Sequence, residues 1–382
     1  MPSSIDIERL LAPRVLDIET SGIRRAWALA ADCVDPINLS IGQPDFPVPD
    51  ELKAAAIAAI ENDHNGYTHT KGDSELLASI EKKLTKDVAW SFEDNSGLTA
   101  MVTSGTAGAL TLVCLAILGP GDEIIIPDPY FVIYPTLARI AEAKAVLCDT
   151  YPDFRMTVDR IEPLITSKTK AVLLNSPGNP TGAVLRADEV EAVANLCKER
   201  GILLITDEIY DEFIFPPTTH ASPASFSEDV LIVRGYSKTH GCTGWRLGYA
   251  AGPERLIDEM LKLKQQTFVC APSALQKAVV NAHDIDLSPM LERFTSRRDM
   301  VVDLLGDVTE LTVPDGSFFA FPRVPEHLGM TGSEFIAKAI EQDVLVIQGN
   351  VFSAKDSHFR ISFAAADDLL ERGLIILRSL LS

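Results

Sequence analysis

The stretch GILLITDEIY, residues 201–210, places four apolar residues between a glycine and the polar sequence Thr-Asp-Glu. A continuous apolar run of this length, bounded by turn and polar residues, is typical of a strand buried on both faces of a sheet. Three further stretches share this pattern and also end in turn or polar residues: DEIIIPDP (122–129), KAVLLNSPGNP (170–180) and VLIVRGYSK (230–238). The sequence therefore predicts a set of fully buried strands.

The segments between these runs carry helical patterns. The stretch RADEVEAVANLCKERG (186–201) has apolar residues at helical spacing, acidic residues in its first turn, basic residues in its last turn and a closing Gly201. Alternating strands and helices predict an α/β fold, a mostly parallel sheet flanked by helices. Such sheets bind ligands at the carboxyl ends of their strands, so NSPGNP, TDEIY and YSK are expected to meet at one edge.

The length and the later part of the chain indicate more than one domain. A chain of 382 residues suggests about two domains. After residue 285 or so, the pattern changes to an arginine-rich helix, the sequence DGSFFAFP, a further helix and the strand-like SHFRISFA. We expect a large domain over residues 41–285 and a smaller α+β domain over residues 286–382, with the segment 1–40 packing against the smaller domain.

The charge limits the partners that the protein can have. The chain has 46% apolar and 23% charged residues, as in an ordinary globular protein, and a formal net charge of −20. That charge argues against nucleic acids and anionic membranes as partners, because both would be repelled. We expect small-molecule ligands, with any anion site built locally from a few placed cations or backbone amides.

Cysteine and histidine spacing gives no sign of a disulfide framework or a metal site. Six cysteines are spread along the chain without a C-x-x-C pair, and the seven histidines do not cluster at ligand spacing. The N-terminal MPSSIDIERLLAPR lacks the apolar stretch of a signal peptide, and the longest apolar run, ALTLVCLAIL (109–118), is too short to span a bilayer. A cytoplasmic protein is expected.

Three stretches in a fixed order resemble the class I/II aminotransferases, which are pyridoxal-phosphate enzymes of fold type I: NSPGNPTG (175–182), TDEIYDEF (206–213) and SKTHGCTGWRLGY (237–249). Further blocks extend the resemblance over nearly the whole chain: SGIRRAWALA, LSIGQPDFPVP, YTHTKGDSELLASI, VTSGTAGAL, DPYFVIY, DGSFFAF and FRISFA. The resemblance implies an enzyme that uses pyridoxal 5′-phosphate to move an amino group from an α-amino acid to a 2-oxo acid.

The resemblance assigns catalytic roles to three residues. Lys238 would bond to the cofactor aldehyde and, once freed by the substrate, carry the proton from the substrate Cα, which requires a lowered pKa. Asp207 would face the pyridine nitrogen and keep it protonated. Tyr210, together with Asn179, would hydrogen-bond the phenolic oxygen of the cofactor.

The resemblance also implies a local site for the cofactor phosphate. The stretch SGTAGAL would open a helix, with the amides of Gly105, Thr106 and Ala107 directed at the anion. Ser237 would add a hydroxyl group, and Arg246 would add a forked cation.

Aromatic residues complete the implied cofactor site. Phe131 would stack on the pyridine ring, and its neighbours Tyr130 and Tyr134 would be in position to line the pocket. Tyr67 matches a family tyrosine that reaches the phosphate from a second subunit, so the resemblance implies a homodimer with shared active sites.

The substrate site implied by the resemblance centres on Arg360, which would grip the substrate α-carboxylate in a bidentate pair beside Asn179 and the Gly42 amide. Family members of the bacterial aspartate type often carry a lysine where this chain has Ala107. The donor therefore stays open among the aspartate, aromatic and alanine types. His240 and Cys242 depart from the family pattern as well, and we interpret His240 as a packed residue.

Two other functions are compatible with these motifs. A lyase that eliminates Cβ or Cγ substituents uses the same lysine, aspartate, tyrosine and arginine, and differs in releasing pyruvate and ammonia. The cofactor-binding half of a transcription regulator would need an added DNA-binding domain, for which the roughly 20 residues before the first family block are too few. The acidic charge also opposes DNA binding.

Overall fold

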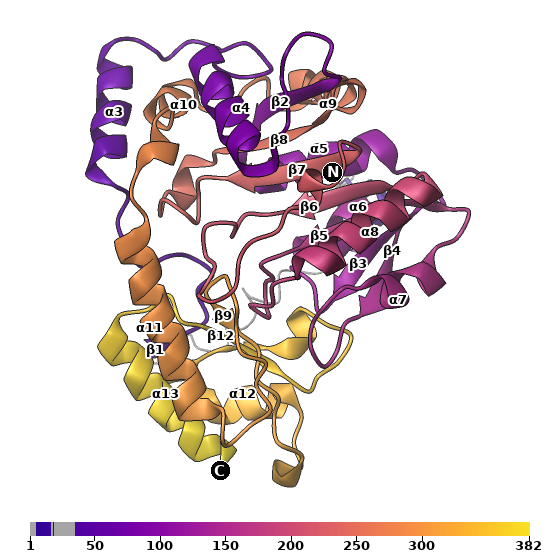
Figure 1. Ribbon diagram of the computed structural model, residues 1–382. Coiled ribbons are helices and arrows are strands. Elements are labelled where there is room, and N and C mark those ends of the chain that lie inside the picture. The colour runs from indigo at the N-terminus through magenta and orange to yellow at the C-terminus, as the bar shows by residue number, and fades with distance from the viewer. Residues whose placement is uncertain (1–4, 17, 19–34) are drawn as a thin grey trace.

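A seven-stranded sheet lies at the centre of the computed structural model, which describes residues 5–16, 18 and 35–382 (Figure 1). Its strands follow the order β2-β8-β7-β6-β5-β3-β4. Neighbouring strands are parallel except at β8, which runs antiparallel to β2 and β7. The expected mostly parallel sheet is thus confirmed. The strands are Leu98–Thr103 (β2), Glu123–Asp128 (β3), Lys144–Asp149 (β4), Thr169–Asn175 (β5), Leu203–Asp207 (β6), Val230–Gly235 (β7) and Gly248–Pro253 (β8).

The four apolar runs of the sequence form β3, β5, β6 and β7. Their register places Asn175 of β5 opposite Asp207 of β6, and Asp207 opposite Val233 of β7. The carboxyl ends of these three strands therefore lie at one level. The polar residues that end each run come together at the same edge of the sheet, as the sequence predicts.

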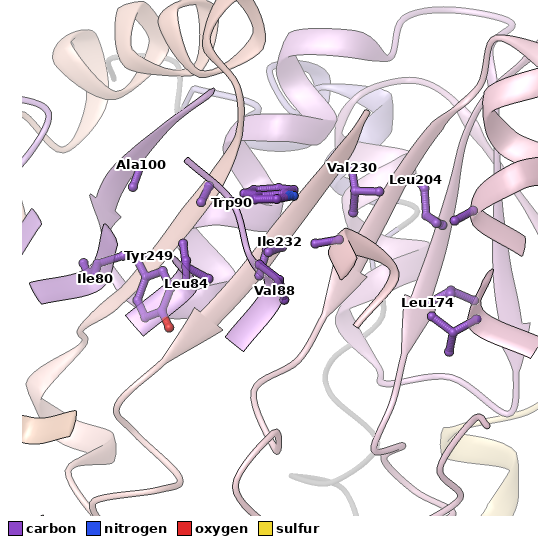
Figure 2. Close-up of a cluster of buried hydrophobic side chains, with 14 of the residues drawn as sticks. Ile80, Leu84, Val88, Trp90, Ala100, Leu174, Leu204, Val230, Ile232 and Tyr249 are labelled. Carbon is purple, nitrogen blue, oxygen red and sulfur yellow. The ribbon is translucent and has the colours of Figure 1, made fainter. Parts of the chain in front are cut away.

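Each face of the sheet has its own apolar core, because successive strand residues point to opposite faces. Leu174, Leu204 and Ile232 belong to one core, part of which Figure 2 shows. Helices α4 (Ser74–Val88) and α8 (Ala187–Arg200) cover that face. The other core contains Ile205, Leu231 and Ala250 and is covered by α5 (Gly105–Ile117), α6 (Ile133–Ile140) and α9 (Glu254–Thr267). Burial on both faces explains the uniformly apolar strands.

The predicted helix between β5 and β6 is α8, and its ends follow the sequence signals. At its start the Glu189 carboxylate accepts a hydrogen bond of 2.9 Å from the Arg186 N–H. At its end Gly201 adopts a left-handed conformation with φ 65° and donates its N–H to the carbonyls of Cys197 and Lys198. These caps stop the helix at the point where β6 begins.

The C-terminal part of the chain forms a separate apolar core around Phe294, Phe335 and Leu374. Figure 1 shows α11 and α13 side by side in this part of the molecule. Its main elements are an antiparallel sheet of β9 (Phe319–Ala320), β11 (Ile347–Gln348) and β12 (Phe359–Ser362), and the helices α11 (Ser288–Leu305), α12 (Gly332–Glu341) and α13 (Asp367–Leu381).

A short parallel pair joins residues 37–38 to this C-terminal part: β1 (Ile37–Asn38) pairs with β10 (Val344–Leu345). The domain boundaries at residues 40 and 285 stay a prediction, and the family-like block SGIRRAWALA lies outside the described residues. The other α-helices among the described residues are α1 (Pro13–Leu16), α3 (Asp50–Glu61), α7 (Val158–Ile161) and α10 (Ser273–Ala278). Within the described ranges, no helix has both the length and the apolar character needed to cross a bilayer.

A buried charged cluster lies beneath the edge where β6 and β7 end. Arg234 of β7 contacts the Glu208 carboxylate at 2.9 Å and the Asp87 carboxylate at 2.7 Å. Glu208 also accepts a hydrogen bond of 2.6 Å from the Ser222 hydroxyl. Burial alone would raise the pKa of Glu208, but Arg234, His220 and Ser222 outweigh it and lower that pKa to about 2. The cluster therefore stays charged and fixes β7 against the end of β6.

Substituting Arg234→Met is expected to lower the free energy of unfolding of the apoprotein by about 3–5 kcal/mol, because it leaves buried carboxylates without their cation. The matched control is Arg255→Met, which removes an exposed i,i+4 ion pair with Glu259 and should change stability little. Denaturant unfolding of the native protein and of the two variants measures both effects. If Arg234→Met and Arg255→Met lost the same free energy of unfolding, the role given to the charged cluster would be contradicted.

Candidate active site

A cavity of about 380 Å³ opens at the carboxyl edge of the sheet. It collects residues from the ends of β5, β6 and β7, from the start of α5, and from the C-terminal part of the chain. Most of the site residues predicted from the sequence line it: Gly42, Thr106, Ala107, Phe131, Asn179, Asp207, Tyr210, Ser237, Lys238, Arg246 and Arg360.

Lys238 lies in the turn that follows β7, and its ammonium faces the cavity. Its Nζ donates a hydrogen bond of 2.5 Å to the Gly42 carbonyl. Removal from water lowers the pKa of Lys238 to about 8, and the nearby cations Arg360 and Arg246 act in the same direction. A lysine with this pKa is partly deprotonated near neutral pH, so it can act as a nucleophile or a base.

Asp207 is the last residue of β6 and is almost fully buried. Its Oδ2 accepts a hydrogen bond of 2.8 Å from the Tyr134 hydroxyl, and its Oδ1 accepts one of 3.3 Å from the Ile209 N–H. The Asn175 side chain donates to the Asp207 carbonyl at 3.0 Å. Burial raises the pKa of Asp207 to about 6, while the Tyr134 hydrogen bond opposes that rise.

Arg360 of β12 is a fully buried cation that lines the same cavity. It donates to the Asn179 side-chain oxygen at 3.0 Å and to the Ser40 carbonyl at 2.8 Å. Its Nε finds no hydrogen-bond partner among the described residues. Burial lowers the pKa of Arg360 to about 10. A buried guanidinium with an unused donor is suited to an anionic ligand.

Tyr210 stands beside this arginine. The Asn179 amide donates to the Tyr210 hydroxyl at 3.4 Å, and Tyr210 packs edge-on against Phe318 and Phe319. Burial raises the pKa of Tyr210. A neutral phenol in this position can donate a hydrogen bond into the cavity.

The start of α5 forms a second candidate anion site. Gly105 has φ 69°, and a Cβ built on it would lie 2.7 Å from Arg246 Nη2. Only glycine therefore lets the turn lie against the guanidinium. Arg246 is itself in a left-handed conformation with φ 54° and donates to the Thr243 carbonyl at 3.0 Å. Ser237 lines the same cavity.

The structure does not bring every predicted residue to the cavity. The Tyr67 side chain is 87% exposed and lines a separate surface hollow with His64 and Thr68. Phe131 lines the cavity, with its ring edge-on to Tyr134 at a centroid distance of 5.7 Å. His240 is buried and its Nε2 contacts the Ala282 carbonyl, in agreement with its interpretation as a packed residue.

Several lining residues were not recognised in the sequence. They are Ile41, Gln43, Asn175, Ile209 and Thr243. The hydrogen bond from Tyr134 to Asp207 was not predicted either. Asn175 had a usable signal, because it ends an apolar strand run. Tyr134 was expected only to line the pocket, since nothing in the sequence tells which side chain on α6 faces Asp207. Among the described residues, no group of three side chains is arranged to hold a metal ion.

The chain is similar to known proteins over almost its full length. The family model "Aminotransferase class I and II" matches residues 34–374. A protein of Bacillus subtilis, described as a probable N-acetyl-LL-diaminopimelate aminotransferase, is 35% identical over 96% of this chain and 95% of its own. The aspartate aminotransferase of Pyrococcus abyssi is 35% identical over 94% of each chain.

Solved structures agree with this similarity. The aspartate aminotransferase from Thermus thermophilus with maleate superposes with a TM-score of 0.91 at 30% identity, covering 97% of this chain and 99% of that one. The aromatic aminotransferase from Pyrococcus horikoshii gives a TM-score of 0.86 at 33% identity, covering 94% of this chain and 98% of that one. These similarities do not favour the lyase alternative. The family model and these relatives cover nearly the whole chain, so the chain belongs to the class I and II aminotransferases and is an aminotransferase.

Proposed function

We propose that the cavity binds pyridoxal 5′-phosphate and that the enzyme transfers the amino group of an α-amino acid to a 2-oxo acid with Lys238 as the reacting amine. The observation that carries the proposal is the position of Lys238 between a buried carboxylate, Asp207, and two cations, Arg246 and Arg360, in one cavity. When bound, the cofactor supplies an aldehyde for amines and a ring that accepts electrons from the substrate Cα.

The residues present fit this cofactor at its phosphate end. The Gly105 turn packs against Arg246, where a Cβ would clash, and the first amides of α5 are not used by helix hydrogen bonds. Thr106 and Ser237 line the same cavity as Arg246. We assign the phosphate to Arg246, Ser237 and the amides of Gly105, Thr106 and Ala107.

Asp207 is assigned to the pyridine nitrogen. Near neutral pH a carboxyl group with a pKa of about 6 is mostly ionised, so it can accept a hydrogen bond from a protonated ring nitrogen. The Tyr134 hydroxyl occupies Oδ2 and fixes the orientation of the carboxylate. Tyr210 and Asn179 are assigned to the phenolic oxygen, and Phe131 to the ring face.

Lys238 is assigned to proton transfer at the substrate Cα. Its Nζ reaches the Gly42 carbonyl, so the amine lies on the side of the cavity where Arg360 would hold the substrate carboxylate. The unused Nε of Arg360 supports carboxylate binding there, with Asn179 and the Gly42 amide beside it. The fixed arginine and the amine would thereby orient the Cα–H bond for removal of its proton.

Tyr67 is assigned to the phosphate of a second copy of the chain. Its side chain is 87% exposed, and it lies in a hollow separate from the cavity of its own chain. An exposed phenol outside the cavity of its own chain is available to the phosphate site of a neighbouring subunit. We therefore propose a homodimer in which each active site is completed by the partner, acting in the cytoplasm on small-molecule substrates.

Lys238→Ala is expected to abolish the reversible change of cofactor absorbance that an amino acid, followed by 2-oxoglutarate, produces in the native enzyme. In the native apoprotein, the rate of bond formation with added cofactor should rise with pH around a midpoint near 8, because only the deprotonated amine reacts. Stopped-flow absorbance measures both. Normal amino-group transfer by the Lys238→Ala enzyme would refute the assignment.

Arg360→Lys tests the carboxylate site. The variant should lose roughly a hundredfold in kcat/KM for α-amino acids, because a forked, charge-assisted contact is replaced by a point charge. Amines that have the same side chain but lack the carboxylate should react as slowly as they do with the native enzyme. If amino acids and carboxylate-free amines lost activity equally, Arg360 would have a role other than carboxylate binding.

Mixed dimers test the contribution of Tyr67 to the partner. A dimer of one Tyr67→Phe subunit and one Lys238→Ala subunit, isolated with two affinity tags, should contain one fully native site and one doubly defective site. Its cofactor affinity at the functional site should match that of the native enzyme, whereas the Tyr67→Phe homodimer should bind the cofactor more weakly. A mixed dimer no better than the Tyr67→Phe homodimer would contradict shared sites.

A further inference from the structure

Lys264 of α9 is a fully buried lysine outside the cavity. Its Nζ donates to the Val102 carbonyl at 2.7 Å and to the Thr70 carbonyl. The described residues place no carboxylate within ion-pair distance of it. The ammonium is therefore held by backbone carbonyls of two segments: the end of β2 and the loop that follows Tyr67.

This arrangement is unfavourable for stability. Burial lowers the pKa of Lys264 to about 8, so removal from water disfavours the charged form and the carbonyls restore only part of the lost hydration. A methionine of similar volume would remove the buried charge, but it would leave the Thr70 and Val102 carbonyls without this donor. Groups that weaken the fold in this way are expected where function needs them.

The segment that Lys264 contacts is fixed at several further points. The Val102 N–H donates to the Lys71 carbonyl at 2.8 Å. Gln276, also fully buried, donates to the Thr68 hydroxyl at 3.1 Å and accepts from the Asp73 N–H at 2.9 Å. Gly72 has φ 142°, and a Cβ there would lie 2.5 Å from Val102 Cγ2. Residues 68–73 are thus held tightly to the body of the protein.

Tyr67 directly precedes this fixed segment and projects from it with 87% of its surface exposed. An exposed side chain gains no direction from packing, so its direction depends on the backbone next to it. Among the residues that the structure describes, the buried side chains of Lys264 and Gln276 bind this segment from within.

We propose that Lys264 is a positioning residue that acts across the subunit interface: it holds the backbone at Thr70 so that Tyr67 meets the phosphate site of the partner. The inference rests on the proposed function and its shared active sites. It adds that a side chain buried in one subunit controls cofactor binding in the other.

The first experiment compares Lys264→Met with Lys262→Met. Lys262 lies on the same helix, is 69% exposed and pairs with Glu259, so it serves as the matched control. Lys264→Met should leave the thermal midpoint of the apoprotein close to the native value, because removal of the buried charge offsets the loss of two carbonyl hydrogen bonds. It should nevertheless weaken pyridoxal 5′-phosphate binding roughly tenfold, which corresponds to the loss of about one hydrogen bond to a charged group. A residue with a merely structural role would lose stability and affinity together.

The second experiment uses mixed dimers of Lys264→Met and Lys238→Ala subunits. The functional site then has its own Lys238 and a Tyr67 held by a native Lys264 from the partner, so its cofactor dissociation constant should return to the native value. An effect through Val102 and the Gly105 turn of the same chain would leave that site impaired. Absence of recovery would therefore overturn the inference.

Two comparisons separate this inference from the proposed function. If Tyr67→Phe mixed dimers recover native affinity and Lys264→Met mixed dimers do not, the inference fails while the shared site stands. If neither recovers, the shared site itself fails and takes the inference with it. If Lys264→Met does not fold, the test is repeated with Lys264→Gln, whose amide cannot span both carbonyls. Failure of both variants to fold would show that Lys264 is required for the structure and would overturn the inference.

Discussion

The parallel register of β5, β6 and β7 is the constraint on which the site depends. Because Asn175, Asp207 and Val233 lie level across three strands, the residues that end these strands reach one cavity although they are far apart in the sequence. The buried contact of Arg234 with Glu208 fixes the same strand ends from below. Glu208 directly follows Asp207, and Arg234 lies four residues before Lys238, so the cluster holds the backbone from which both side chains project.

The site is also an electrostatic exception in an acidic protein. The chain carries a net charge of −20, yet Lys238, Arg246 and Arg360 converge on one cavity. Burial and the two arginines lower the pKa of Lys238, whereas burial raises the pKa of Asp207. The two groups thus titrate much closer together than a free lysine and aspartate do, which suits the exchange of protons near neutral pH. The cations also concentrate anionic ligands locally, against the repulsion of the whole protein.

Much of the fold and of the candidate site could be predicted from the sequence. Continuous apolar runs identify strands buried on both faces, and the polar residues that follow these runs mark the edge of the sheet where ligands bind. The bond from Tyr134 to Asp207 could not be predicted, since it depends on how α6 packs over the sheet. Lys264 gives no signal either: a lysine on an amphipathic helix is normally solvated, and only the structure shows it buried. The proposed role of Tyr67 at the phosphate site of a partner rests on the family resemblance, because its side chain lies outside the cavity of its own chain.

The central claim, amino-group transfer, is tested most directly by following the nitrogen atom. A panel of L-amino acids isotopically labelled in the amino group would be incubated with the enzyme, pyridoxal 5′-phosphate and unlabelled 2-oxoglutarate, and the products separated by mass spectrometry. The account predicts that the label appears in newly formed glutamate, with the 2-oxo acid of the donor in equal amount. Release of the label as ammonia together with pyruvate, and no labelled glutamate, would contradict it.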